Sequence, residues 1–586
     1  MRRSAAALLS CLAACLVLTG CGVGMPESGP VHETSATGSH RDDGSVSIRP
    51  LRPGKGDSPD QIVRGFIDAM RATPAITTSV ARQFLTRQAS TAWQPTGMVI
   101  YGRVVPPRGN NKVEVTLTDA ARTDGRGAWL GPVPEGNLTV EFPMALDDGE
   151  WRISEPPPFL IVPQSWFAQR FQQASLYFFD PSANILVPEP VFVPRGRQFL
   201  SSLVNGLLQV PSPELAGTEQ SYFPRDLRSL SVPVSESGVA QVDLTSDTAA
   251  ATVPSPEQIE LMVSQLAWTL RQDPTISRFR VTIDGRPVQL PNEQEFSVDH
   301  GHQYAPYVAG SSTQLFGLQD GLMVGGSPQN LEPVDGPFGV ADHGLRTVAP
   351  DLRAEQVAGV SAAGDTLSVA PVRDTGEEPQ DLITTGEDLL TPAWDFRGRL
   401  WEVDRRTTGA VVYYLDQRTQ RMVPLAVDGI SGEDVKGFLI SRDGSRLIAV
   451  IRGSAEEDSI VVSRIVSTGE GQVVGALSAE NLPDPDNLDG QIRDIAWRSP
   501  TSIAVLQPIN HALFQVRNAS VDGAPLADPA VTIDEPVAGL IGTPVEGEPI
   551  YVFIRSETRT ALADLAGPRG ERIDVDPALT MLAYVN

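Results

Sequence analysis

Two histidines are the residues whose types and spacing come closest to a metal-binding pattern. His300 and His302 flank a glycine, and on a strand this i, i+2 spacing places both imidazoles on one side, where they could chelate a transition metal. A third ligand is not apparent nearby in the sequence. We therefore predict that residues 300–302 belong to a solvated linker between domains and that no histidine-based metal site is present.

An acidic run, Asp484–Gly490, is similar in outline to a calcium-binding loop. Its fifth position is Leu488, its glycine comes one residue late, and its twelfth position is Ile495 in place of glutamate. Oxygen ligands are thus missing where Ca²⁺ requires them. We predict an acidic surface loop of the C-terminal domain and no metal.

A carboxylate pair is suggested by Asp243 and Asp284, each at the end of a strand-like run. Asp284 precedes Gly285, a dipeptide that tight turns favour for backbone reasons, and Asp243 stands where aspartate often caps a strand end. The sequence contains no G-x-S-x-G, S-x-x-K or H-E-x-x-H motif and no phosphate-binding glycine loop. We predict no catalytic residue, no cofactor and no enzyme, although the many acids leave a glycosidase-like pair open.

One residue has a pattern for covalent modification. Arg2 and Arg3 form a basic start, Ala5–Leu18 is an apolar run too short for a comfortable membrane span, and Leu-Thr-Gly-Cys ends at Cys21. This order is similar to the bacterial lipobox. We predict cleavage between Gly20 and Cys21, with S-diacylglycerol and an N-acyl chain such as palmitate on Cys21. The alternative is an ordinary cleaved signal with an incidental cysteine.

Cysteine usage and charge exclude several classes of protein. Cys11 and Cys15 lie in the predicted signal peptide, so the mature chain has no disulfide, no cysteine nucleophile and no cysteine-based metal site. The net charge is −26, and removal of residues 1–20 deletes two arginines and no acid, which leaves −28. We therefore expect no nucleic-acid binding and no basic attachment to an anionic leaflet. The acyl chains must hold the protein at the membrane.

The first folded unit follows a flexible tether. Residues 21–56 carry the predicted lipid and are rich in Gly, Ser, Pro and charge. The unit itself is expected over residues 57–160, where Ser58 and Pro59 open an amphipathic helix, a second helical piece ends near Trp93, and alternating strand-like runs follow. This order predicts a small, cone-like α+β domain. Residues 161–194 are rich in aromatics, and we expect this interdomain segment to pack against a neighbouring domain.

The second unit, residues 195–300, is also α+β. Leucines from 200 to 208 form one helical stripe, Ser255 opens a second helix, and strand-like runs lie between and after them. This unit resembles the GerMN domain, an extracytoplasmic module of sporulation and germination lipoproteins. The residues that match are Leu203–Leu208, Ser221–Pro224, Val242–Leu244, Gln265–Leu270 and Val281–Gly285.

Residues 312–586 contain many short strands and turns and no convincing long helix. A strand, a polar turn and a second strand recur with anchors at Trp394, Ser441, Trp497 and Thr543, about one propeller blade apart. We therefore predict a C-terminal β-propeller of about six blades. A pair of β-sandwiches is the alternative.

The order of these parts resembles the LpqB lipoprotein family of actinobacteria over essentially the whole mature chain. The resemblance implies a lipid-anchored protein on the extracytoplasmic face of the cell membrane. It also implies an accessory role in the MtrA–MtrB two-component system through contact with the sensor domain of the kinase MtrB, and so an influence on cell-wall homeostasis and division. No binding residue is carried over.

A different class of function stays open at this point. The protein could be an anchored enzyme or ligand-binding protein that acts on wall polymer, with a site in the propeller channel or in the N-terminal α+β domain. Convergent carboxylates or aromatics at such a site would favour that class. A purely structural wall adaptor is a third possibility.

Overall fold

The fold is known from a computed structural model that describes residues 50–586, except 72–77, 210–214, 216, 230, 247–253, 292, 374–375, 454–456, 483–489, 511, 557–558, 568–570 and 586. Cys21, Gly20, the signal peptide and the tether up to residue 49 therefore lie outside the described residues, as does most of the acidic run 484–490. No helix of the described chain is long and apolar enough to cross a bilayer.

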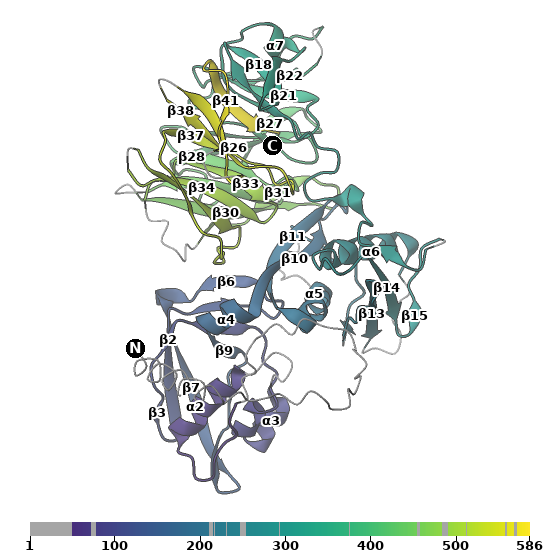
Figure 1. Ribbon diagram of the computed structural model, residues 1–586, viewed down its shortest axis with the longest axis vertical. Coiled ribbons are helices and arrows are strands. Elements are labelled where there is room, and N and C mark those ends of the chain that lie inside the picture. The colour runs from purple at the N-terminus through teal and green to yellow at the C-terminus, as the bar shows by residue number, and fades with distance from the viewer. Residues whose placement is uncertain are drawn as a thin grey trace, which may run out of the picture. The chain divides into compact units, whose positions relative to one another are not determined.

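The N-terminal domain begins with helix α2 (Pro59–Met70), as its capping pattern predicts. The Ser58 backbone N–H donates to Gln61 Oε1 over 2.9 Å, and the apolar stripe of the helix is buried. The second helical piece is split into η2 (Ala81–Phe84) and α3 (Arg87–Ala92), which ends at Trp93. The elements are drawn in purple and blue in Figure 1.

Two sheets complete this domain. The first has the order β6-β5-β1-β9 and the second the order β2-β4-β7-β8, with β3 beside β4. Asp148 and Gly149 both have positive φ in the tight turn that joins β7 to β8. The strands and the short helix of this domain are β1 (Met98–Tyr101), β2 (Arg103–Val104), β3 (Arg108–Gly109), β4 (Lys112–Thr118), β5 (Ala121–Thr123), β6 (Trp129–Pro132), η3 (Pro134–Gly136), β7 (Asn137–Asp147), β8 (Glu150–Ile153) and β9 (Leu160–Pro163).

The segment predicted to lie between domains is a long hairpin. Helix α4 (Gln164–Arg170) leads into β10 (Phe171–Phe179), which pairs along its whole length with β11 (Leu186–Pro194). Its side chains enter two cores. Phe171 and Phe192 pack in the core that contains Met98 and Trp166, whereas Leu176 and neighbours pack in the core of the next domain.

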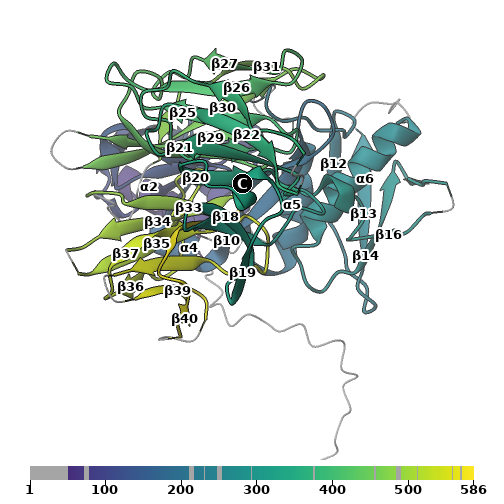
Figure 2. The same ribbon diagram turned by 90° about the horizontal axis from the view of Figure 1, so that it is seen from above.

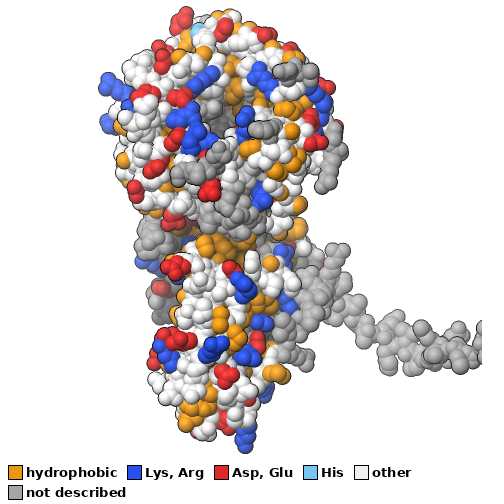
Figure 3. Space-filling model, turned by 90° about the vertical axis from the view of Figure 1, so that its left-hand side faces the viewer, with side chains coloured by type: hydrophobic (Ala, Val, Ile, Leu, Met, Phe, Trp, Pro, Cys, Tyr) orange, Lys and Arg blue, Asp and Glu red, His pale blue; other side chains and the backbone are white. Residues whose placement is uncertain are grey.

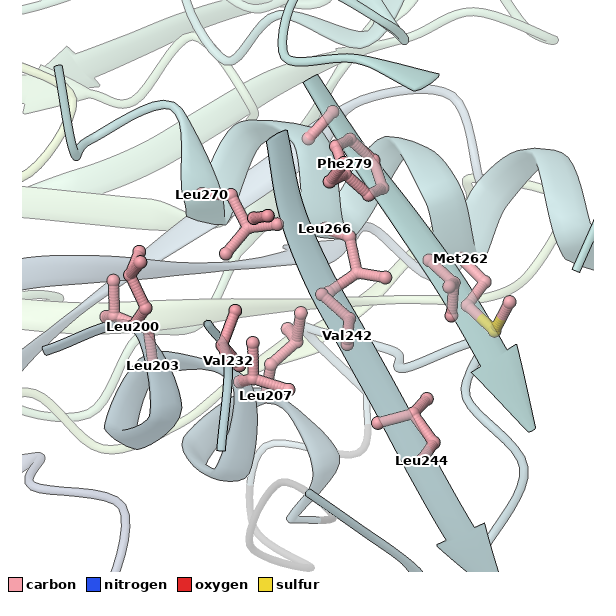
Figure 4. Packing of buried hydrophobic residues seen from close by; sticks show 14 of the residues in the cluster. Leu200, Leu203, Leu207, Val232, Val242, Leu244, Met262, Leu266, Leu270 and Phe279 are labelled. Carbon is pink, nitrogen blue, oxygen red and sulfur yellow. The ribbon is translucent and has the colours of Figure 1, made fainter. Parts of the chain in front are cut away.

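The GerMN-like domain packs two helices against one sheet, as Figure 4 shows. Leucines of α5 and of α6 meet Val242 and Leu244 of β13 and Phe279 of β14, and β13 pairs with β14 in parallel. Ser255 Oγ accepts the Gln258 N–H at the start of α6. The elements are η4 (Gly196–Gln198), α5 (Phe199–Leu208), β12 (Leu227–Ser229), β13 (Val239–Ser246), α6 (Pro256–Leu270), β14 (Arg278–Ile283), β15 (Arg286–Pro287), β16 (Phe296–Ser297) and η6 (His302–Tyr304).

The described C-terminal residues form six antiparallel sheets in a closed ring. Each sheet has four consecutive strands, except that β41 joins β17–β19 and β32 adds to β28–β31. The pairing of β41 with β17 closes the ring, and Figures 1 and 2 show these yellow strands beside the teal strands that begin the domain. The predicted fold, two small α+β domains followed by a β-propeller, is thus confirmed.

The repeat anchors have a structural role in the ring. Trp394 Nε1 donates to the Ala349 carbonyl over 2.9 Å, and Trp497 Nε1 donates to the Ile440 carbonyl over 3.0 Å, so each indole ties its sheet to the preceding one. The first three sheets are β17 (Leu315–Gln319), β18 (Leu322–Ser327), β19 (Asn330–Pro333) and β41 (Leu579–Tyr584); β20 (Leu345–Pro350), β21 (Gln356–Ser361), β22 (Leu367–Pro371) and β23 (Gln380–Ile383); β24 (Ala393–Trp394), β25 (Leu400–Asp404), β26 (Val411–Asp416) and β27 (Arg421–Leu425).

Helix α7 (Pro337–Val340) lies in the connection between the first two sheets. The other three sheets are β28 (Val435–Ile440), β29 (Arg446–Arg452), β30 (Asp458–Ser467), β31 (Val473–Ala476) and β32 (Glu480–Asn481); β33 (Asp494–Ser499), β34 (Ser502–Pro508), β35 (Phe514–Ser520) and β36 (Val531–Ile533); β37 (Val537–Ile541), β38 (Tyr551–Arg555), β39 (Thr560–Asp564) and β40 (Ile573–Asp574).

Candidate functional site

The carboxylates singled out in the sequence have local partners. Asp243 Oδ1 accepts the Thr282 hydroxyl over 2.7 Å and the Gln241 amide over 2.8 Å. Asp284, with a φ of 49°, accepts the Ser246 N–H over 2.9 Å and forms the turn with Gly285. Asp284 thus has the turn role that its sequence context favours. Asp243 was expected at a strand end, but it lies inside β13, where it is paired with Thr282 of β14.

The two histidines have different surroundings. His300 Nε2 lies 3.1 Å from Glu260 Oε2, and its ring packs edge-on against Phe296, whereas the His302 ring faces Tyr307. This segment is less solvated than predicted, because Trp268 Nε1 donates to the Gly301 carbonyl and holds it against α6. In the described chain no three His, Cys, Asp or Glu side chains are grouped to hold a metal ion.

The hairpin β10–β11 brings the propeller into contact with the α+β domains through Glu189. Arg464 of β30 donates to both carboxylate oxygens, each over 2.7 Å, and Arg446 Nη2 at the start of β29 donates to Oε1 over 2.5 Å. Arg446 Nη2 also donates to the Pro188 carbonyl over 2.7 Å. A forked arginine–carboxylate contact of this kind fixes orientation as well as distance.

A second carboxylate, Glu219, lies beside this group. Burial and the neighbouring Glu189 raise the pKa of Glu219 well above its usual value. Its Oε1 is 3.5 Å from Nη1 of Arg126, which belongs to the N-terminal domain and is itself held by Asp124. Burial alone would also raise the pKa of Glu189, but Arg446 and Arg464 outweigh it and hold that pKa well below the ordinary range. The surroundings therefore favour the charged form of Glu189 and the protonated form of Glu219.

Further contacts join the same side of the propeller to the hairpin. Arg397 Nη2 lies 3.6 Å from Asp180 Oδ2, and Gln173 Nε2 donates to the Ser520 hydroxyl over 2.8 Å. The inner strands of the propeller, one in each sheet, are β20, β24, β28, β33, β37 and β41. We use the name junction side for the side of the propeller that faces the hairpin. It includes the loops that follow five of the inner strands, residues 351–355, 395–399, 441–445, 500–501 and 542–550.

A buried arginine closes the propeller channel at the junction side. Arg442, two residues after the end of β28, donates from Nη1 to the Tyr307 carbonyl and the Ser311 hydroxyl, both over 2.9 Å. Its Nη2 donates to Thr543 Oγ1 over 3.0 Å and to the Val585 carbonyl over 2.7 Å. Because Thr543 follows β37 and Val585 follows β41, this one side chain joins the ends of three inner strands. Burial lowers the pKa of Arg442 to about 9.

The channel itself is a cavity of about 370 Å³ along the inner strands. Small residues, such as Ala349, Ala393 and Gly437, line much of it, together with Phe438 and Trp497. Its size is within the range of small-molecule pockets. The cavity therefore has room for a small ligand or for a side chain of a partner.

Two charged side chains line the channel, Asp494 and Lys436. Lys436 Nζ donates to Asp458 Oδ2 over 2.6 Å and to the Ile492 carbonyl over 2.7 Å, so its charge is compensated. Asp494 accepts two backbone N–H groups, of Ile495 over 2.9 Å and of Leu540 over 2.7 Å. Burial raises the pKa of Asp494 to about 6 against these two hydrogen bonds.

This lining does not match the chemistry of a glycosidase. Hydrolysis of a glycosidic bond uses two carboxyl groups on opposite sides of the bond, and among the described lining residues Asp494 is the only carboxylate. In the face that Figure 3 shows, acidic, basic and hydrophobic side chains are interspersed.

Sequence reasoning missed the junction and the closed channel end. Glu189 was detectable as a single acid within the apolar run Leu186–Pro194. Nothing near Arg442, Arg446 or Arg464 in the sequence identifies Thr543 or Glu189 as a partner, because these residues lie more than 100 positions away.

Three family models match successive parts of the chain. The model described as "Lipoprotein LpqB, N-terminal domain" matches residues 52–168, the model "Sporulation and spore germination" matches residues 175–289, and the model "Lipoprotein LpqB beta-propeller domain" matches residues 321–552. The second match begins inside the hairpin, in agreement with the packing of β10 into that domain's core.

Curated relatives span almost the whole chain. Lipoprotein LpqB of Thermobifida fusca is 27% identical over 585 residues, which cover 89% of this chain and 90% of the relative. Lipoprotein LpqB of Mycobacterium bovis is 27% identical and covers 88% and 90%. Lipoprotein LpqB of Streptomyces coelicolor is 23% identical and covers 89% of each chain.

Solved structures match single parts. The first GerMN domain of the sporulation protein GerM from Bacillus subtilis is 19% identical, covers 22% of this chain and 97% of its own, and gives a TM-score of 0.19. A chain of a nidogen/laminin complex is 12% identical, covers 46% of this chain and 98% of its own, and gives a TM-score of 0.33.

Proposed function

We infer from the membership of this chain in the lipoprotein LpqB family that it acts by protein–protein contact outside the cytoplasm. We propose that Cys21 carries the lipid that anchors it to the outer face of the cell membrane, where it contacts the sensor domain of an MtrB-like histidine kinase. Through that contact it would modulate the MtrA–MtrB system, and so cell-wall homeostasis and division.

One observation supports contact with a protein more than catalysis. The junction engages one side of the propeller through Glu189, Arg397 and Arg442, so the loops at the other side are presented on a rigid ring. Loops placed on a rigid scaffold are common sites of protein recognition. The single channel carboxylate gives no pair for hydrolysis.

The lipid would assist this contact by confinement. A lipid anchor restricts the protein to the plane in which the kinase sensor domain lies, which raises the effective concentration of the two partners. A moderate intrinsic affinity would then be enough. The predicted tether of residues 21–56 has the composition of a flexible chain and would allow the folded part to reach its partner.

The anchor is tested by replacement of the predicted lipidated residue. We expect the Cys21→Ala variant to leave the membrane fraction, because the acyl chains on Cys21 are the proposed anchor. Fractionation after a high-salt wash, with the Cys11→Ala variant as control, measures this. Retention of the Cys21→Ala variant in washed membranes would contradict the anchor.

The partner is tested with the mature lipidated chain in nanodiscs. We expect it to bind the purified extracytoplasmic sensor domain of the kinase in calorimetry. A pull-down from membranes provides the matching measurement in the native setting. Absence of binding at high micromolar concentrations would contradict the proposed function.

A further inference from the structure

The two ends of the propeller channel differ in what covers them. At the junction side Arg442 crosses between the ends of three inner strands and binds the segment that contains Tyr307 and Ser311. The opposite end is where the inner strands β20, β24, β28, β33, β37 and β41 begin. Their early residues, Lys436, Asp494 and Thr580 among them, line the cavity. We call this end, with the connections that lead into the inner strands, the mouth.

The mouth connections are strongly acidic. Their described residues include ten Asp and Glu side chains and one arginine, Arg493. The loops of the junction side include six acids and four arginines. The mouth connections are residues 334–344, 384–392, 426–434, 482–493, 534–536 and 575–578.

Few of the mouth carboxylates are neutralised within the chain. Asp388 pairs with Arg346 and Arg405, Asp434 pairs with Arg452 at 3.0 Å, and Glu535 pairs with Arg572 at 2.8 Å. Over the described residues, the remaining carboxylates of the mouth have no arginine or lysine nitrogen within ion-pairing distance. The mouth therefore presents uncompensated negative charge to solvent.

A carboxylate inside the channel adds an independent observation. Asp494 stands at the first position of β33, lines the cavity, and accepts hydrogen bonds from two backbone N–H groups. The described chain places no Lys or Arg nitrogen in ion-pairing distance of it, although the other charged lining residue, Lys436, is paired with Asp458. A cation that entered from the mouth would find an uncompensated carboxylate within the cavity.

We propose that the mouth is the surface that binds the protein partner, and that the partner presents a basic segment with one arginine or lysine side chain inserted toward Asp494. This proposal rests on the proposed function, since it assigns the surface and the chemistry of the same contact. The cavity of about 370 Å³ can hold one long side chain with its neighbours. Charge complementarity of this kind sets specificity and speeds association.

The side of the propeller that is already engaged supports the choice of the mouth. Arg397, Arg446 and Ser520 are all in contact with the hairpin 171–194, so the junction side is occupied by this chain itself. A partner that needs a rigid surface would meet the mouth, where the connections project from the start of every inner strand.

The proposal is tested by reversal of charge at the mouth. The triple variant Asp335→Lys, Glu433→Lys and Asp534→Lys changes three exposed acids that pair with no arginine or lysine of the described chain. The control variant Glu155→Lys, Glu236→Lys and Glu378→Lys makes the same change in net charge away from the mouth. Both are prepared as the full mature chain in nanodiscs, and their affinity for the kinase sensor domain is measured at low and moderate salt.

We expect the mouth variant to bind at least about tenfold more weakly and to lose most of the salt dependence, with a change of less than about threefold for the control. If the mouth variant and the unaltered chain bind the sensor domain with equal affinity, the mouth is not the binding surface, although the proposed function still stands. If the unaltered chain does not bind at all, the proposed function fails and not only the choice of surface. Equal weakening by both triples would also overturn the proposal, since net charge alone would then explain it.

A separate variant tests whether a cationic side chain of the partner is inserted toward Asp494. Asp494→Asn keeps the shape of the side chain and removes its charge, so we expect affinity to fall about fivefold or more, with a smaller dependence on pH between 5 and 7. Unchanged affinity and pH dependence would overturn insertion of a cationic side chain. Circular dichroism of each variant confirms that the fold is retained.

Discussion

The two ends of the propeller channel differ in whether their charged side chains are buried with partners or exposed without them. At the junction side Glu189 is buried between two arginines, and the buried Arg442 uses both terminal nitrogens in four hydrogen bonds. At the mouth, carboxylates such as Glu433 and Asp534 are exposed, and no arginine or lysine of the described chain pairs with them. Charge that is buried in a fold must be compensated, whereas exposed charge can be kept for a partner.

This contrast explains which contacts are structural. The Glu189 cluster joins elements that are far apart in the sequence, and every charged member of it faces another part of the same chain. Variants at the junction should therefore change stability. Variants at the mouth should change binding and leave stability almost unaltered, because exposed charges contribute little to it.

The largest effect is expected from Glu189→Ala. It leaves Arg446 and Arg464 buried without their carboxylate, and we expect a loss of about 3–5 kcal/mol in the free energy of unfolding. Chemical denaturation at neutral pH measures this, with Glu155→Ala as the exposed control. A loss below about 1 kcal/mol would show that the buried cluster does not hold the junction.

A smaller loss is expected from Arg442→Met. The variant fills the space but removes the donors to the Tyr307 and Val585 carbonyls. We therefore expect the free energy of unfolding to fall by about 2–3 kcal/mol. Thermal unfolding followed by near-UV circular dichroism measures it. Proteolysis should become faster in the segment around residues 305–311, and an unchanged cleavage rate there would contradict the closing role of Arg442.

Asp494→Asn should have the opposite sign. Burial raises the pKa of this carboxyl from 3.8 to about 6, so at pH 7 its ionisation disfavours the folded state. Between about pH 6 and pH 4 the folded state holds a proton on this carboxyl and the unfolded state does not, so stability rises as pH falls through this window. The amide can accept only one of the two backbone N–H groups, but removal of the buried charge outweighs this loss. We therefore expect Asp494→Asn to stabilise the fold by about 1 kcal/mol at pH 7 and to remove this pH dependence. A destabilised variant would show that the two hydrogen bonds to the carboxylate outweigh the cost of its buried charge.

The smallest effect is expected from Glu219→Gln. Burial and Glu189 raise the pKa of Glu219 well above its usual value, which favours the uncharged form of the side chain. We therefore expect Glu219→Gln to change the free energy of unfolding by less than about 1 kcal/mol, whereas Glu189→Gln should lower it several times more. Parallel denaturation of the two variants distinguishes them. Equal losses would mean that the charge is shared between the two carboxyls.

The sequence predicts those features of the fold that depend on neighbouring residues. Helix α2 follows from its capping residues and its apolar stripe, and the propeller follows from repeats in which Trp394 and Trp497 have equivalent roles. The charged site could not be predicted in the same way. Glu189 and Arg464 are 275 residues apart, and neither has a local pattern that identifies the other.

One expectation about packing agrees with the structure and a second is corrected by it. The segment 161–194 was expected to pack against a neighbouring domain, and its apolar strands in fact enter the core of the GerMN-like domain as well as that of the N-terminal domain. The linker at His300 was expected to be solvated, but Trp268 and Glu260 of α6 hold it in place. In both cases the contact comes from an element that is distant in the sequence.

Amide hydrogen exchange of the mature lipidated chain, with and without the kinase sensor domain, tests the central claim most directly. The account predicts that binding slows exchange in the mouth connections 426–434, 534–536 and 575–578 and leaves the junction loops 351–355 and 441–445 unchanged. Protection confined to the junction loops or to the α+β domains, with the mouth unaffected, would contradict it.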